Sequence, residues 1–274
     1  MELGQSFITE NSDKDAMLNR TFAFAGVVLI FMTPAASALE KLVGTYGEAR
    51  TTLTFKVPDA TAQNMLPQGW LAIPFSAGPS KGANLVVTFM DWLVAQDPDG
   101  KPMSTYSHVG LTVPAKQNGT EATVSMVVTG LSAPPGYAPG PYGNFEAAKS
   151  IIARTLRIDD DGISRAEESW QFEGESGDSI QLQLQFVRGS AARTKLEAKV
   201  HSAMKPEFYR VYRIEEAVDV IRSAAIGTDR VQNYRFKALG PGFSKLFDGS
   251  EQLVSITSFP WFSRQAFLPV SPAK

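Results

Sequence analysis

The chain has 274 residues, of which 43% are apolar and 20% charged, and its formal net charge is -2. This composition is typical of a globular protein and excludes a disordered or fibrous chain. The near-neutral balance, without a Lys/Arg block, argues against nucleic-acid binding, and the lack of cysteine excludes disulfides, thiolate nucleophiles and Cys-based zinc sites.

The N-terminal segment has the pattern of a secretory signal peptide. Arg20 precedes an apolar run over residues 22–32, and Pro34 and the small residues 36–38 follow. A membrane span needs about 20 apolar residues, so the run is too short to be one. We therefore expect cleavage after Ala38 and no stable membrane span in the mature chain. An uncleaved anchor or a buried helix is the alternative.

The sequence also predicts the domain organisation and the location of the protein. Residues 1–16 are polar and acidic, unlike the start of a signal peptide, so Met17 is expected to be the natural start. Residues 1–38 are predicted to be an N-terminal extension with the signal peptide. Residues 40–274 are predicted to form a single domain, because no repeat or linker interrupts them. An exported chain without disulfides favours a bacterial periplasmic or secreted protein.

After this segment, short stretches of alternating apolar and polar residues are separated by turn residues, which indicates mostly β structure. The clearest stretch, residues 179–186, has apolar residues on one face and Gln181, Gln183 and Gln185 on the other. The predicted strands are 51–57, 84–96, 108–116, 121–130, 179–189, 194–203, 207–214, 231–242 and 252–269.

Helical signals are few. Asp59 is a candidate N-cap for one or two turns that end at Pro67. Residues 215–224 carry apolar residues on one side and are predicted to be helical, and residues 144–155 to begin as a helix and end as a strand. The predicted fold class is mainly β: a closed or strongly curved antiparallel sheet with a few short peripheral helices.

Motifs for metal or cofactor chemistry are missing from the sequence. His108 and His201 are the two histidines, on different predicted strands and without metal-ligand spacing. The acidic turns at 97–100 and 159–162 lack the other ligands of a calcium loop, so they are predicted hairpin turns. No phosphate-binding or dinucleotide fingerprint is present. We therefore expect neither a metal nor a cofactor.

A sheet that closes on itself can enclose a small-ligand pocket. The last predicted strand would line it with Phe259 and Trp261 as apolar wall and Arg264 as a carboxylate anchor. Tyr142, from the loop over residues 130–143, is a further candidate. That loop is too rich in proline and glycine to be a helix or a central strand. The alternative is that these aromatic residues are ordinary core.

Several patches resemble the acetoacetate decarboxylase family in order and spacing. They are "FKVPDATAQNMLPQGW", "NLVVTFMDW" followed by "TYSHVGLTVPAK", and "PEFYRVYRI", "VQNYRFKALGPGFSKLFD" and "LVSITSFPWFSRQAFLP" near the end. The resemblance spans roughly residues 50–269. It implies the family's cone-shaped antiparallel β-barrel with an interior ligand pocket.

In that family a lysine of a Pro-Lys-Lys segment forms a Schiff base with a keto acid. The two alignments of this chain place residues 136–137 or 146–147 at the lysine positions, and neither supplies an amine. The family's Gly-Arg-Glu is absent, and His108 stands where its Tyr-x-Glu has the glutamate. Lys149, three residues beyond the second alignment's lysine position, is the one candidate for a displaced amine.

Three functions follow as hypotheses. The first is an exported barrel that binds a small oxo acid or related carbonyl compound without a Schiff base. The second is a lyase acting on a β-keto acid through Lys149, with Glu146 or His108 tuning proton transfer. The third is a structural or partner-binding envelope protein whose interior is filled by side chains and holds no ligand pocket. Enzymatic activity and a homo-oligomer are both left open, because fold resemblance alone does not grant activity.

Overall fold

The computed structural model describes residues 40–270. The predicted signal peptide and its cleavage site lie outside the described residues. Within them, no helix has both the length and the apolar character that crossing a membrane requires.

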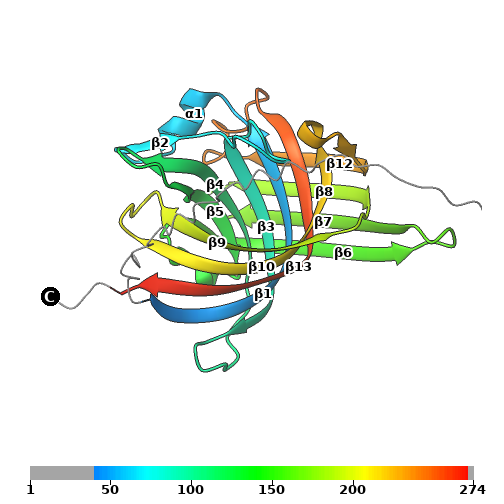
Figure 1. The fold of residues 1–274 in the computed structure, drawn as a ribbon, viewed down its shortest axis with the longest axis horizontal. Helices are drawn as coiled ribbons and strands as arrows, with labels where there is room; N and C mark the ends of the chain where they lie inside the picture. The colour runs from blue at the N-terminus through cyan, green and yellow to red at the C-terminus, as the bar shows by residue number, and fades with distance from the viewer. Residues whose placement is uncertain (1–39, 271–274) are drawn as a thin grey trace, which may run out of the picture. The chain divides into compact units, whose positions relative to one another are not determined.

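Strands make up most of the described chain, so the predicted mainly β class is confirmed (Figure 1). The elements are β1 Glu40–Lys56, α1 Asp59–Asn64, β2 Trp70–Ala72, β3 Leu85–Gln96, β4 Ser107–Gln117, β5 Thr123–Ala133, η1 Pro135–Tyr137, β6 Phe145–Ile158, β7 Ser164–Gly174, β8 Ser179–Val187, β9 Ala192–Ser202, β10 Tyr209–Ser223, η2 Ala224–Ile226, β11 Thr228–Asp229, β12 Val231–Leu239 and β13 Gln252–Pro269.

The strand pairings form a ring. Following the hydrogen-bonded neighbours from β1 through β3, β4, β5, β9, β10 and β13 leads back to β1. The pairings in this ring are antiparallel except for the short parallel pair β5–β9. A second parallel pair, β5–β6, leads from the ring into a four-stranded sheet in the order β6, β7, β8, β12. The curved sheet that the sequence predicts therefore also contains parallel pairs.

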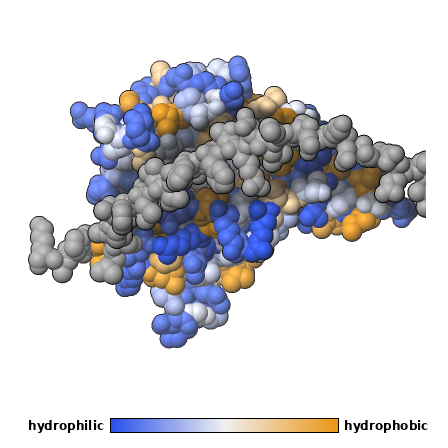
Figure 2. Space-filling model, viewed as in Figure 1, coloured by the Kyte–Doolittle hydropathy of each residue, from blue (hydrophilic) through white to orange (hydrophobic). Residues whose placement is uncertain are grey.

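The main apolar core lies between one face of the ring strands and the four-stranded sheet (Figure 1). Leu53 and Phe89 of the ring and Trp170 and Leu182 of the sheet are fully buried, and the Phe89 and Trp170 rings lie 5.8 Å apart. Burying such a side chain contributes about 1.5–3 kcal/mol. Outside, Figure 2 shows a mostly hydrophilic face on which hydrophobic residues form separate small groups, as expected for a surface in water.

Two stretches that the sequence predicted to be helical are strands, and the N-cap of the one predicted short helix is a different residue. Residues 215–224 lie mostly in β10, which pairs with β9 on one side and β13 on the other. A short apolar stretch fits either period, and the two neighbouring strands decide for β. Residues 144–155 lie almost wholly in β6. The predicted short helix is present as α1, but its N-cap is Pro58, and Asp59 instead accepts a hydrogen bond from Asn84.

Candidate functional site

The face of the ring strands opposite the apolar core points into the ring. Arg50 of β1 pairs with Met90 of β3, Met90 with His108 of β4, and His108 with Ser132 of β5. Directly paired residues of neighbouring strands present their side chains on the same face. Four strands therefore direct a row of mostly polar side chains into the interior.

A buried ion-pair network lies beside this row. Glu48 has a fully buried side chain, and the Arg50 guanidinium donates a hydrogen bond to its Oε2 at 2.6 Å. Arg264 of β13 lies on its other side, with Nε 2.6 Å from Glu48 Oε1. Burial alone would raise the pKa of Glu48, but Arg264 and Arg50 outweigh burial and hold that pKa below its ordinary value. Glu48 is therefore a buried carboxylate ionised at neutral pH.

Aromatic rings enclose these charges. The guanidinium of Arg50 lies 3.7 Å from the centre of the Phe262 ring, and that of Arg264 lies 4.6 Å from the Tyr212 ring. Such stacking is favourable for a desolvated guanidinium. The aromatic residues that cluster in the interior are Tyr46, Trp92, Tyr106, Tyr137, Tyr142, Phe145, Phe208 and Tyr212.

His108 is buried among these rings, 5.4 Å from Trp92 and 5.6 Å from Phe145 between ring centres. Burial, with a smaller contribution from the two nearby arginines, lowers the pKa of His108 to about 3, so the imidazole is neutral. Among the described residues, His108 Nδ1, Trp92 Nε1 and Ser132 Oγ find no hydrogen-bond partner. Buried polar groups are normally satisfied, so these atoms mark a place where a polar molecule can bind.

An additional cation, Arg210, lies near two tyrosines of the same interior cluster. The hydroxyl oxygens of Tyr142 and Tyr212 lie 2.9 Å apart, and the pKa of Tyr142 is raised by burial and by Tyr212. Arg210 faces the same tyrosines and makes no ion pair with another residue of the described chain. Glu216, which accepts a hydrogen bond from Thr194, is the other carboxylate near the network. Three guanidiniums thus face two carboxylates.

The proline- and glycine-rich loop builds part of the aromatic wall, since it supplies Tyr137, Tyr142 and Phe145 to the interior cluster. Gly130, paired with Phe145, makes room for that ring: a Cβ atom at Gly130 would lie 2.5 Å from the phenyl ring and 2.6 Å from the Val109 carbonyl oxygen. The loop therefore contributes aromatic rings to the interior, where the resemblance would place an amine.

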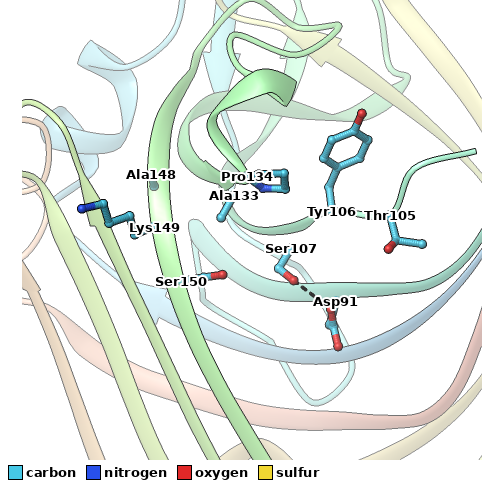
Figure 3. Close-up of a pocket in the computed structure, with 9 residues that line it drawn as sticks. All are labelled: Asp91, Thr105, Tyr106, Ser107, Ala133, Pro134, Ala148, Lys149 and Ser150. Atoms are coloured by element: carbon cyan, nitrogen blue, oxygen red, sulfur yellow. Dashed lines mark hydrogen bonds between the residues drawn. The ribbon is translucent and has the colours of Figure 1, made fainter.

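Lys149 and Glu146 do not reach the ring interior. Lys149 is exposed at the edge of an outer pocket of about 420 Å³, and Figure 3 shows its amine directed away from Ser107. Asp91 and Ser107 of this pocket lie on the outward face of β3 and β4, because Met90 and His108 point inward and side chains alternate along a strand. The Glu146 carboxylate accepts hydrogen bonds from the backbone N–H and hydroxyl of Ser176.

The pocket residues predicted on the last strand do not all point into the ring. Arg264 points into the ring, whereas Trp261 is 43% exposed and lies under Arg193. Phe259 packs edge-on against Phe262, at a distance of 5.8 Å between ring centres. The structure therefore brings His108, Tyr142 and Arg264 together in one interior, and leaves Lys149, Glu146 and Trp261 outside it.

The sequence reasoning missed most of the charged network, above all Glu48 and Arg50. A usable signal was present: residues 44–52 read "GTYGEARTT", in which Tyr46, Glu48 and Arg50 alternate with small residues. Polar residues at period two beside a predicted strand indicate one face that is not ordinary core. Across residues 40–270, no group of three His, Asp or Glu side chains is arranged to hold a metal ion.

Comparisons with known proteins give the fold. No protein-family model and no curated protein matches the sequence. Among solved structures, the enduracididine biosynthesis enzyme MppR with bound HEPES is similar with a TM-score of 0.52 and 12% identity, over 86% of this chain and 89% of that chain. MppR complexed with pyruvate gives a TM-score of 0.50 at 12% identity, over 86% and 91%.

An acetoacetate decarboxylase-like enzyme from Sphingomonas wittichii RW1 is similar with a TM-score of 0.49 and 10% identity, over 88% of this chain and 98% of that chain. At such identities a structural likeness establishes the fold and leaves the activity open. The comparisons therefore establish that this chain has the fold of MppR, and the structure is mainly β, as the sequence predicted.

Proposed function

We propose that the chain binds a small organic acid with a carbonyl group inside the ring, without forming a Schiff base. The observation that carries this proposal is the excess of positive charge around the interior network, where the half-buried Arg210 lacks an ion-pair partner among the described residues. A charge that is partly removed from water is costly unless it is paired. An anionic ligand supplies the missing partner.

The interior offers different groups to the two ends of such a ligand. Arg264 and Arg210 both border Tyr212, so a carboxylate between them would accept charge-assisted hydrogen bonds. The unpartnered indole N–H of Trp92 and the neutral imidazole of His108 are suited to a carbonyl oxygen. Because the side chains of Glu48 and Arg264 are buried or nearly so, electrostatic interactions beside them are stronger than they would be at the surface.

The position of Lys149, the lysine expected to replace the family's amine, speaks against the Schiff-base route. A lysine that attacks a carbonyl must reach it and be held neutral by an apolar or cationic site. Lys149 is exposed and directed away from the interior, which favours binding without covalent chemistry. The similar protein MppR has been seen complexed with pyruvate, which is a ligand of the proposed class. From the signal-like N-terminal segment we also propose a periplasmic or secreted location.

Calorimetric titration with pyruvate and with acetoacetate tests the binding site. We expect Arg264→Gln to weaken binding at least about tenfold, because a charge-assisted hydrogen bond is worth about 1.5–3 kcal/mol. Arg157→Gln is the matched control, since that side chain is 70% exposed on the β6–β7 hairpin. Equal affinities for the parent chain and Arg264→Gln would refute the interior site.

Borohydride reduction in the presence of acetoacetate tests the mode of binding. We expect the intact mass of the parent chain to be unchanged after reduction. We also expect Lys149→Ala to bind acetoacetate with the same affinity as the parent chain. A reduced adduct mapped to Lys149 would overturn the proposal in favour of the lyase. Absence of binding for both acids would remove the proposed ligand class.

A further inference from the structure

A second cleft lies between the outward face of the ring and the four-stranded sheet, where the apolar core ends. Its volume is about 270 Å³, and its lining includes Arg154 of β6, Glu168 of β7, Arg188 just after β8, and Ser258 of β13. Arg154 and Glu168 are paired across β6 and β7, so both side chains point from the sheet towards the ring.

Glu168 is the unusual group in this cleft, because it is a carboxylate with only 3% of its surface exposed. Thr51 Oγ1 and Trp170 Nε1 both donate to its Oε2, at 2.5 Å and 2.9 Å. Its Oε1 accepts no hydrogen bond from another described residue. Arg154 Nε, at 3.9 Å, is too far for one. One oxygen is thus held in place, and the other is free to accept from a ligand in the cleft.

Two guanidiniums flank this carboxylate. Arg154 makes no closer ion pair than the 3.9 Å contact with Glu168, and Arg188 makes none with residues 40–270. A guanidinium fork matches the geometry of a carboxylate group. The cleft therefore presents an acceptor for a cationic group next to donors for an anionic one.

Apart from Thr155, the rest of the lining is apolar. Leu156 and Ala166 of the β6–β7 pair, Phe186 of β8 and Pro260 of β13 line the same cleft. An apolar side chain of a few carbon atoms would remove these surfaces from water. A large or charged side chain would gain nothing from them.

We propose that this cleft binds a small apolar α-amino acid, with its ammonium on Glu168 Oε1 and its carboxylate on Arg154 and Arg188. The site is separate from the ring interior. Arg50 and Thr51 are consecutive residues of β1 and point to opposite faces, one to the interior network and the other to Glu168. The proposal does not depend on what the ring interior binds.

Titration of the full chain with L-valine, followed by calorimetry and by ligand-observed NMR, tests the site. We expect saturable binding that Glu168→Gln weakens at least about tenfold, since the ammonium loses its charged acceptor. Glu167→Gln is the matched control: Glu167 is exposed and its side chain points away from the cleft. Arg188→Gln should weaken binding as well, and it serves as the test if Glu168→Gln does not fold.

Two valine analogues test the two ends of the ligand. 2-Hydroxy-3-methylbutyrate replaces the ammonium by a hydroxyl, and isobutylamine lacks the carboxylate; both should bind at least about tenfold more weakly than valine. The proposal would be overturned by any of three results. These are an affinity for the hydroxy acid equal to that for valine, a loss of valine affinity in Glu167→Gln equal to that in Glu168→Gln, or no saturable valine binding. Pyruvate binding should be the same in Glu168→Gln and the parent chain, which separates failure here from failure of the ring-interior site.

Discussion

Lowering the pH from 7 to 5 should destabilise the folded chain through His108. Because His108 is buried, its pKa in the folded state is about 3, whereas an unfolded histidine has a pKa near 6.5. As the pH falls below 6.5 the unfolded chain takes up a proton that the folded chain does not, so stability falls between pH 6.5 and 3. At pH 5 this one group costs about 2 kcal/mol relative to pH 7.

Urea unfolding followed by tryptophan fluorescence at pH 7 and pH 5 measures this loss. Between pH 7 and pH 5, the free energy of unfolding should fall by about 2 kcal/mol less in His108→Gln than in the parent chain. Comparing the two chains cancels the contribution of the other titrating groups. His201→Gln should remove less, since His201 is only partly buried. Glu48 contributes little between pH 7 and pH 5, because its unfolded pKa of 4.5 and its lowered folded pKa both lie below this window. An equal loss in His108→Gln and the parent would refute a buried neutral His108.

Three further perturbations have expected outcomes. Glu48→Gln leaves its two arginines buried without this carboxylate, so urea titration should show a loss of about 3–5 kcal/mol in stability; a loss under about 1 kcal/mol would contradict the buried network. Gly130→Ala should cost about 1–3 kcal/mol by crowding the phenyl ring, whereas Gly136→Ala, with nothing within 4 Å, should be nearly neutral in thermal melts. Tyr142→Phe removes a hydroxyl pair and should cost about 1 kcal/mol by the same measurement.

The candidate site was only partly predictable, because a strand assigns its side chains to two faces. Trp261 and Arg264 are an odd number of positions apart, so one faces out and the other in, although both fit an apolar pocket on composition. Lys149 and Phe145 are an even number of positions apart, so alternation alone would place them on the same face. Phe145 to Ala147 pair with β5 of the ring, whereas β6 pairs with β7 from Ala148 onwards, and Lys149 is exposed there. Residue type gave the candidates, and strand phase, strand bulges and the change of pairing partner along β6 decided which of them reach the interior.

The amino-acid sequence by itself determined many local features of this protein: most of the strands, the short helix after Lys56, the turn-rich loop, and the missing lysine in that loop. These features follow from period, propensity and residue type, which act over a few neighbours. Only the tertiary structure decided that the strands close into a ring and that Glu48, His108 and Arg264 meet inside it. Strand pairing joins segments far apart in the chain, and the local pattern does not specify which partner or which register will be chosen.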